Sequence, residues 1–281
     1  MLHYLENEFL KISVDTHGAE LSSIYNKKTD KNMLWHGDSA FWGRKSPVLF
    51  PVVGKYKNGK TTYNGKEYAL GQHGFARDME FALIEKGENK LSFSLESNEE
   101  TLTKYPFKFR LVCSFELINN KITVGWNVKN TDDKTIYFSI GAHPAFYCKK
   151  SETVLSMNGE NLKYNLINSD GLYTAQKYET ENSFVLHDNV FDNDALIIEN
   201  SEVTEVSLIN NNKKYLTVKF DAPLFGIWSP TKKNAPFVCI EPWYGRCDAE
   251  VFNGDITERE WGNSLEVGET WYKEYEIIIH E

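Results

Sequence analysis

His143 and Glu241 are the two residues whose types and surroundings best suit proton-transfer chemistry. His143 follows the strand-like run 135–139 and lies in the segment 140–146. Glu241 ends the apolar run 237–240 and is followed by a proline and a tryptophan. An imidazole and a carboxylate, each at the end of an apolar strand, could remove one proton from a substrate and donate another to it. The two segments therefore predict general acid–base catalysis.

Each of these residues also has an ordinary structural interpretation. A histidine beside Pro144 could be a satisfied turn or core residue. If it faces a site instead, Phe146 and Tyr147 would form an apolar wall, and the pKa of the imidazole is expected to stay near neutral. Glu241 could form a salt bridge with Arg246 at the rim of a sheet. A carboxylate with restricted solvent has a raised pKa, which suits a general base, and we therefore favour catalytic roles for both residues.

The segment 72–77 predicts a substrate-binding loop that contains Gln72, His73 and Arg77. Gln72 and Arg77 could donate hydrogen bonds to substrate oxygens, and Arg44 could add a second basic contact. The planar guanidinium of arginine suits a carboxylate or a phosphate. The alternative is a turn that carries a surface arginine.

Aromatic residues in or near these segments are candidates for stacking against a sugar ring. Trp243, Trp228, Phe75 and Phe146 could each belong to the core or form a platform for the C–H face of a pyranose. Trp243 directly follows the glutamate and proline, and we include it among the candidate substrate contacts.

Other chemistries find less support in the sequence. His73, His143 and Glu241 could form a metal site of two histidines and one carboxylate, but no HxH or HxxxE spacing supports it. The sequence contains no GxSxG segment for a serine nucleophile. It also lacks the glycine-rich motifs that bind nucleotide phosphates. We therefore expect neither a metal nor a cofactor.

The composition and net charge of the chain argue against nucleic acid and a membrane as partners. The net charge of −9 argues against nucleic acid, which requires an excess of basic residues. The start of the chain lacks the pattern of a signal peptide, and no apolar run approaches membrane-spanning length, so a cytoplasmic protein without a membrane partner is expected. The four cysteines lack CxxC spacing and are expected to be buried free thiols.

The elements that must position these residues are predominantly β-strands. Apolar residues occupy every odd position from 107 to 117 and resume at 122, 124, 126 and 128, which predicts a hairpin of half-buried strands. A short strand is expected at 60–63 between two Asn-Gly turns, and a short helix at 99–104. No linker divides the chain. We therefore predict an all-β fold, with one antiparallel β domain over residues 1–281 that is too large for a seven-stranded sandwich.

Taken together, the segments resemble the aldose 1-epimerase (galactose mutarotase) family, in the branch that also contains hexose-6-phosphate epimerases. The resemblance runs nearly end to end, over Gly18–Leu21, Leu49–Gly54, Gln72–Arg77, Gly141–Phe146, Asn193–Leu196 and Cys239–Trp243. It implies the galactose mutarotase-like supersandwich, a large sandwich of antiparallel sheets.

The resemblance also implies roles for individual residues. It implies that Glu241 is the general base, that His143 is the general acid, and that His73 is the second active-site histidine, which binds and polarises the substrate. Asp194 is similar to a carboxylate that binds sugar hydroxyls. In the phosphate-using branch, Gln72, Arg77 and an arginine at the position of Arg44 would hold the 6-phosphate.

The expected activity is the interconversion of the α and β anomers of an aldose pyranose, with a small sugar as the partner. A hexose 6-phosphate substrate and a non-catalytic sugar-binding or sensing protein on the same fold remain alternatives. Retention of both an acid and a base favours the enzyme. The acidic overall charge narrowly favours a neutral aldose over a phosphorylated one. Both a monomer and a homodimer are compatible with the sequence.

Overall fold

The alternation of apolar and polar residues produces strands where the sequence predicts them. A computed structural model of the protein describes residues 1–199 and 202–280. Strand β10 (Phe109–Ile118) buries alternate residues, and a turn at Asn119, whose φ is 53°, leads into β11 (Lys121–Asn130). The two strands pair antiparallel along their whole length, which confirms the predicted hairpin.

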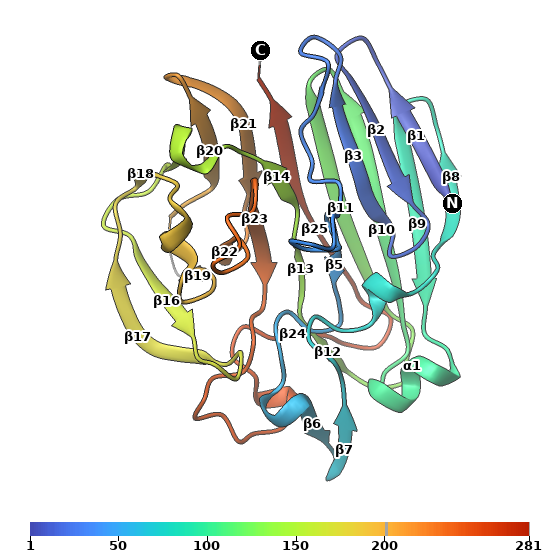
Figure 1. Ribbon diagram of the computed structural model, residues 1–281. Helices are drawn as coiled ribbons and strands as arrows, with labels where there is room; N and C mark the ends of the chain where they lie inside the picture. The colour runs from blue at the N-terminus through green and yellow to red at the C-terminus, as the bar shows by residue number, and fades with distance from the viewer. Residues whose placement is uncertain (200–201, 281) are drawn as a thin grey trace.

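Strands β10 and β11 belong to a nine-stranded sheet that extends across the molecule (Figure 1). In spatial order the sheet consists of β18 (Ser183–Val185), β15 (Thr153–Met157), β20 (Glu205–Asn210), β21 (Lys213–Phe220), β25 (Thr270–Ile279), β11, β10, β9 (Lys90–Glu96) and β8 (Ala82–Lys86).

A second, eight-stranded sheet carries Glu241 and Trp243, and His143 lies directly between two of its strands. Its path is β17 (Tyr173–Glu179), β16 (Lys163–Ile167), β19 (Leu196–Glu199), β22 (Leu224–Trp228), β23 (Phe237–Tyr244), β13 (Ile140–Ala142) and β5 (Val48–Leu49), with β14 (Ala145–Tyr147) also paired to β23.

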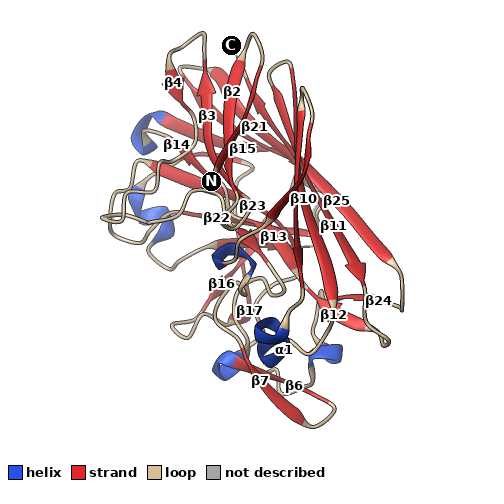
Figure 2. Cartoon of the chain, turned by 90° about the vertical axis from the view of Figure 1, so that its right-hand side faces the viewer, coloured by secondary structure: helices blue, strands red, loops and turns tan. Residues whose placement is uncertain are grey.

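Three smaller sheets complete the described strands. A four-stranded sheet contains β1 (Leu2–Glu6), β2 (Leu10–Asp15), β3 (Glu20–Asn26) and β4 (Lys31–Asn32), and the two-stranded sheets are β12 (Ile136–Phe138) with β24 (Asn263–Leu265) and β6 (Lys60–Tyr63) with β7 (Lys66–Ala69). Figure 2 shows the same strands from the side.

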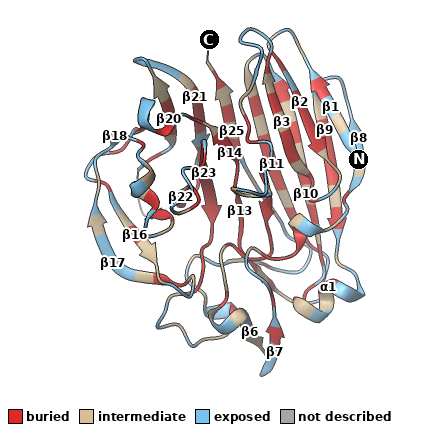
Figure 3. Cartoon of the chain, viewed as in Figure 1, coloured by how far each residue is buried: buried red, intermediate tan, exposed pale blue. Residues whose placement is uncertain are grey.

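One large apolar core joins the nine-, eight- and four-stranded sheets. The same cluster contains Ile12 from β2, Leu111 from β10 and Ile240 from β23, all fully buried. Buried segments follow the strands, whereas exposed residues gather in the loops and on β17 (Figure 3). The prediction of a large antiparallel sandwich is therefore confirmed.

The smaller predicted elements are also present. The predicted strand at 60–63 is β6, and the predicted helix is α1 (Glu99–Lys104), which Asn98 caps by accepting a hydrogen bond from the Thr101 amide. All four cysteines are free and buried, as expected. Within the described ranges, no helix combines the length and apolar character needed to cross a membrane.

Candidate active site

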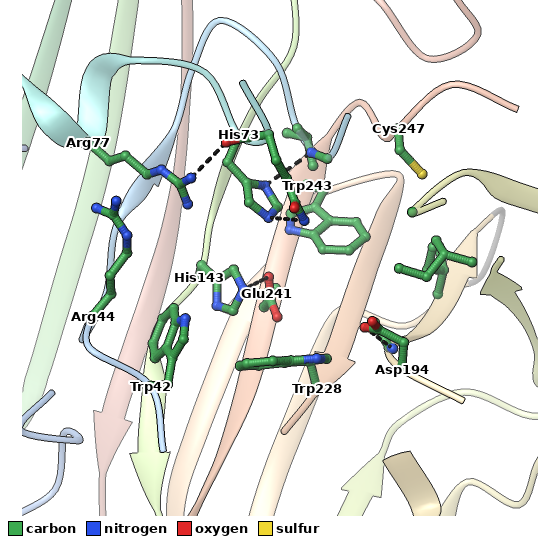
Figure 4. A pocket seen from close by; sticks show the side chains of 17 residues that line it. Trp42, Arg44, His73, Arg77, His143, Asp194, Trp228, Glu241, Trp243 and Cys247 are labelled. Atoms are coloured by element: carbon green, nitrogen blue, oxygen red, sulfur yellow. Dashed lines mark hydrogen bonds and ion pairs between the residues drawn. The ribbon is translucent and has the colours of Figure 1, made fainter. Parts of the chain in front are cut away.

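All eight residues predicted to form a site line one cavity of about 370 Å³. They come from segments far apart in the sequence: Glu241 and Trp243 lie on β23, and the other six lie in loops or short turns between strands. Figure 4 shows the side chains around the cavity. The eight residues are Arg44, Gln72, His73, Arg77, His143, Asp194, Glu241 and Trp243.

Strand register places His143 opposite Glu241. Gly141 pairs with Trp243 before the gap between β13 and β14, and Ala145 pairs with Cys239 after it. The position midway between these antiparallel pairs matches His143 with Glu241. Nε2 of His143 lies 3.4 Å from Oε2 of Glu241. A cross-strand pair on one face of a sheet is thus also a potential acid–base pair.

Burial controls the electrostatics of this pair. The His143 and Glu241 residues are only 7% and 1% exposed. Burial raises the pKa of Glu241 well above its usual value, and the charge of Asp194 adds to this effect, while the Trp243 indole opposes it. Burial, followed by the charge of Arg77, lowers the pKa of His143 to about 3. The expectation of a near-neutral histidine pKa was therefore wrong, because the imidazole is almost completely desolvated and faces cationic side chains.

Glu241 does not form the rim salt bridge with Arg246 that was considered as an alternative. The Arg246 Nε lies 3.3 Å from Oε2 of Glu199, and its Nη2 pairs with Glu260. Its guanidinium also covers the ring of Tyr173 at 3.6 Å. Arg246 therefore has two carboxylate partners of its own, and Glu241 faces the cavity.

His73 lies in a tight loop at one side of the cavity. Its φ is 66°, and Gly74 follows with a φ of 72°, where a Cβ would lie 2.1 Å from the Phe50 carbonyl oxygen. Nδ1 of His73 accepts a hydrogen bond from the Gly54 amide at 3.1 Å. Burial holds the pKa of His73 well below its usual value. The neutral ring therefore carries its proton on Nε2. The side-chain amide of Gln72 lies 3.2 Å from this nitrogen, and it can form a hydrogen bond there only by presenting its oxygen.

Two arginines approach the cavity near His143 (Figure 4). Nη2 of Arg77 donates to the Gln72 carbonyl oxygen at 2.7 Å. Arg44 pairs with Asp78 at 2.8 Å, while Arg77 lies 3.8 Å from the other oxygen of the same carboxylate. Burial and the neighbouring Arg44 lower the pKa of Arg77 to about 10, so its guanidinium still carries a charge at neutral pH.

Asp194 lies on the opposite side of the catalytic pair from the arginines (Figure 4). Its φ is 73°, and its side chain accepts a hydrogen bond from the Ala195 amide at 2.7 Å. Burial raises the pKa of its carboxyl group. The cavity is consequently cationic near His143 and acidic near Glu241.

Trp243 lies across the neighbouring strands, which carry glycines to make room for it. A Cβ on Gly141 of β13 or on Gly226 of β22 would come within 2.6 Å of the indole. The ring therefore lies over the sheet and forms part of the cavity wall. Alanine or any larger residue at these two positions would displace it.

Sequence reasoning missed Trp42. Its ring stacks on the His143 imidazole, with centroids 4.7 Å apart and planes inclined by 26°. Trp228, considered above only as a core residue or a platform, contacts the same imidazole edge-on at 5.4 Å. The position of Trp42 two residues before Arg44 was the only available signal, and it does not reveal contact with a residue a hundred positions away.

Several buried polar atoms that line the cavity make no hydrogen bond within residues 1–199 and 202–280. They are Nε of Arg77, Nδ1 of His143, Oε2 of Glu241 and Nε1 of Trp243. Buried polar atoms in folded proteins usually have partners. A ligand with several hydroxyl groups could supply partners to both the donors and the acceptors.

The potential metal ligands differ from the predicted set. In the described part of the chain, His143, Glu241 and Cys239, rather than His73, place their ligand atoms within 4.8 Å of one another. Burial raises the pKa of the Cys239 thiol well above its usual value, so the thiolate that binds metals is disfavoured. The set is therefore a poor match to a resident metal site.

Comparison with known proteins gives matches over at least 90% of the chain. A family model described as aldose 1-epimerase matches residues 1–277. The plasmid-encoded protein LacX of Lactococcus lactis subsp. lactis is 32% identical over 275 residues, which cover 90% of this chain and 91% of LacX. The chromosomal LacX of the same organism is 31% identical with the same coverage.

Solved structures show the same fold. A galactose mutarotase related enzyme from Lactobacillus acidophilus superposes with a TM-score of 0.95 at 33% identity, covering 100% of this chain and 98% of that one. A galactose mutarotase-like protein from Lactobacillus casei ATCC 334 also gives a TM-score of 0.95, at 28% identity and with complete coverage of both chains. The predicted supersandwich is therefore confirmed.

Proposed function

The chain belongs to the aldose 1-epimerase family, and from this premise we propose that it interconverts the α and β anomers of an aldose pyranose. The observation that carries the proposal is the pairing of His143 with Glu241 at 3.4 Å. The pair lies in a cavity whose wall contains buried polar atoms without described partners. The size of the cavity, about 370 Å³, suits a small ligand.

The reaction requires one proton to leave the sugar and another to enter it. Glu241 removes the proton of the C1 hydroxyl while His143 protonates the ring oxygen. The C1–O5 bond breaks, a C1=O1 double bond forms, and the open aldehyde rotates about C1–C2. Closure on the other face reverses both proton transfers, so the protein ends in its starting state. Each positioned acid or base contributes about 10²–10⁴-fold to such a reaction.

The pair needs one shared proton for this cycle. In the absence of sugar, the raised pKa of Glu241 and the lowered pKa of His143 both favour that proton on the carboxyl group over the imidazole. Sugar hydroxyls that donate to Oε2 of Glu241 would stabilise the carboxylate and shift the proton to His143. The stacked Trp42 ring would stabilise the resulting imidazolium through its π face. Binding would thereby produce the protonation state that catalysis requires.

The remaining residues would bind the sugar. His73 carries its proton on the ring nitrogen near Gln72 and could donate it to a substrate oxygen. Asp194 could accept hydrogen bonds from ring hydroxyls, and the Trp243 ring offers an apolar surface to their C–H groups.

Substitution of Glu241 tests the proposed activity. We expect Glu241→Gln to reduce anomer exchange by at least about 10²-fold, because the amide cannot accept the proton. Sugar binding should persist, since the amide retains the shape of the side chain. Exchange is measured by polarimetry and by NMR exchange spectroscopy of anomeric protons, and binding by calorimetry. His143→Asn should behave in the same way.

Two results would contradict the assignment. Full activity of a correctly folded Glu241→Gln protein would remove this residue from the role of base. Wild-type protein that binds sugars without accelerating exchange would instead indicate a sugar-binding or sensing protein. A melting curve for each variant distinguishes lost chemistry from lost folding.

A hexose 6-phosphate is a second candidate substrate, favoured by the approach of Arg44 and Arg77 to the same carboxylate at one side of the cavity. If the substrate is phosphorylated, Arg77→Ala should raise its KM about ten- to a hundredfold, because a charge-assisted contact contributes about 1.5–3 kcal/mol. Turnover of the neutral sugar should change little.

Arg110→Ala provides a matched control, since Arg110 lies on β10 beside Glu96 and outside the cavity. Steady-state kinetics on glucose and glucose 6-phosphate measure the difference. Equal losses on both sugars would mean that Arg77 contacts the ring or supports the loop, and would favour the neutral aldose.

A further inference from the structure

A single turn, residues 38–42, carries the tryptophan that stacks on the proposed catalytic histidine. The Phe41 and Trp42 amides donate to the Asp38 carbonyl oxygen at 3.1 and 2.9 Å. Oδ1 of Asp38 accepts from the Ala40 amide at 2.9 Å. A segment this short does not keep its conformation by itself, because one turn forms few hydrogen bonds for the residues that it fixes. Contacts with the rest of the protein must therefore decide where Trp42 lies.

Two side chains from outside the turn bind the carbonyl groups at its end. Nε1 of Trp35 donates to the Trp42 carbonyl oxygen at 2.8 Å. Nζ of Lys233 donates to the carbonyl oxygens of Ala40 and Phe41 at 3.2 and 3.0 Å. A cation at the final carbonyl groups of a turn interacts favourably with their dipoles, as it does at the end of a helix. Lys233 therefore ties this turn to a segment 192 residues away in the sequence.

The loop that carries Lys233 is itself held in place. Residues 229–236 connect β22 to β23 and contain a proline near each end, which fixes the φ torsion there. The Asn234 amide donates to Oδ2 of Asp188 at 3.2 Å. Oδ1 of the same carboxylate pairs at 2.7 Å with Nζ of Lys150, whose side chain is only 4% exposed. Lys233 therefore extends from a loop whose backbone is restrained on both sides.

The Trp42 ring lies beside His143 in the cavity (Figure 4). The two ring centroids are 4.7 Å apart, and the planes are inclined by 26°. The same indole meets the rings of Trp228 and Phe237 at centroid distances of 5.7 and 6.0 Å. The π face of an indole stabilises a cation close to it, and this stabilisation is lost when the two groups separate. The position of the turn therefore affects how well the protonated form of His143 is stabilised.

We propose that Lys233 is a positioning residue for the proposed reaction, because its ammonium group holds the turn 38–42 so that Trp42 stays stacked on His143. Lys233 is not among the residues that line the cavity, and it acts only through Trp42. The inference rests on the proposed function for its effect on catalysis. The position of Trp42 can be measured without any activity.

The experiment removes the ammonium group and follows both the ring contact and the rate. Lys233→Met keeps the length of the side chain, Lys233→Arg keeps its donors, and Lys232→Met makes the same change at the neighbouring exposed lysine. NMR signals of the His143 ring protons report the contact, because protons over the face of an indole resonate upfield. His143→Asn identifies these signals by their absence, and Trp42→Leu gives their position without the indole. Polarimetry with glucose and with galactose gives kcat and KM.

In Lys233→Met, the His143 signals should move towards their position in Trp42→Leu. We expect kcat to fall about tenfold, which is the size of effect expected for a lost cation–π contact. KM should change less than about twofold, since the residues proposed to bind the sugar are unaltered. Lys233→Arg should retain the wild-type signals and most of kcat, and Lys232→Met should match the wild type. Lys233→Met added to Trp42→Leu should lower kcat no further, because both substitutions remove the same contact.

Wild-type His143 signals in Lys233→Met would overturn the inference, whatever the rate. Displaced signals with an unchanged kcat would also overturn it, because Lys233 would then have a structural role alone. A further loss of kcat in the double variant, or the same loss in Lys232→Met, would show that the effect does not pass from Lys233 through Trp42.

Melting curves and the wild-type rate separate the remaining outcomes. Lys233 is exposed, so its replacement leaves neither a buried charge nor a cavity, and the variant should melt cooperatively. A variant that does not fold would mean that Lys233 supports the whole fold, and the inference would be wrong. If the wild type accelerates no exchange, the proposed function fails, and the His143 signals alone decide whether Lys233 positions Trp42.

Discussion

The His143 imidazole and the Glu241 carboxyl group experience opposite pKa shifts that have the same main cause. Burial disfavours the charged form of each, so it lowers the pKa of the histidine and raises that of the glutamate. Neighbouring charges reinforce both shifts, because Arg77 lies on the side of His143 and Asp194 on the side of Glu241. Both shifts therefore favour the uncharged forms of the two side chains in the absence of a ligand.

The pKa of His143 predicts a dependence of stability on pH. The folded-state pKa of about 3 lies below the ordinary value of 6.5, so the contribution of this residue to stability is fully present above pH 6.5. As pH falls from 6.5 towards 3, the unfolded chain binds a proton that the folded chain does not. Stability should then decrease by up to about 1.4 kcal/mol for each pH unit.

His143→Gln removes this titration and retains the Glu241 carboxyl group. Denaturant unfolding of both proteins at several pH values between 4 and 7 measures the effect. We expect the free energy of unfolding of the wild type to fall more steeply towards acid than that of the variant. Parallel curves would show that the folded protein accommodates a protonated His143, which would contradict the lowered pKa.

At the scale of residues, the sequence predicted which side chains form the site better than it predicted their pKa values. His143 and Glu241 were recognisable because a histidine and a glutamate at the ends of apolar runs are unusual. The structure brings both into one cavity with the other six predicted residues. The low pKa of His143 and its contact with Trp42 depend on packing between distant segments, which local sequence does not encode.

At the scale of elements, the site depends on a local interruption of β-structure. Strands β13 and β14 both pair with β23 and are separated by His143 and Pro144. Proline has no amide hydrogen to donate to a neighbouring strand, so an interruption at this position costs little. The alternation that predicted the β10–β11 hairpin is absent here, because β23 is buried at every position. Period-two reasoning could therefore find the hairpin but not the register of the catalytic pair.

The two glycines that flank Trp243 give a test at this scale. Gly226→Ala should destabilise the protein by about 1–3 kcal/mol, because its Cβ would lie 2.6 Å from the indole in a closely packed sheet. Activity should also fall, since Gly226 pairs with Glu241 and a displaced Trp243 would shift the cavity wall. Denaturant unfolding and polarimetry measure the two effects.

Two further variants make this test specific. Gly87→Ala is the matched control, because the nearest atom to its new Cβ lies 3.6 Å away. Trp243→Phe in the Gly226→Ala background should recover part of the lost stability, since the smaller ring leaves room for the methyl group. Additive effects of the two substitutions would show that alanine at position 226 acts through the backbone and not through Trp243.

At the scale of the whole molecule, composition and periodicity were sufficient to predict the class of fold. The period-two patterning of segments such as 107–128, together with the Asn-Gly turns, predicted an antiparallel all-β domain, and the resemblance to the aldose 1-epimerase family implied the sandwich. The order of strands within the sheets did not follow from the sequence, because pairs such as β21 with β25 join segments about sixty residues apart. Such pairing is decided by the joint packing of the sheets around the common core.

This common core predicts that residues 1–281 unfold as a single domain. One apolar cluster contains residues of the four-, eight- and nine-stranded sheets, so removal of any sheet would expose the apolar faces of the others. Scanning calorimetry should therefore show one transition, with a calorimetric enthalpy equal to the van't Hoff enthalpy. A bound sugar should raise the Tm of this transition, because it binds only the folded state. Two transitions, with only one shifted by sugar, would mean that the eight-stranded sheet folds independently of the rest, and the single-domain prediction would be wrong.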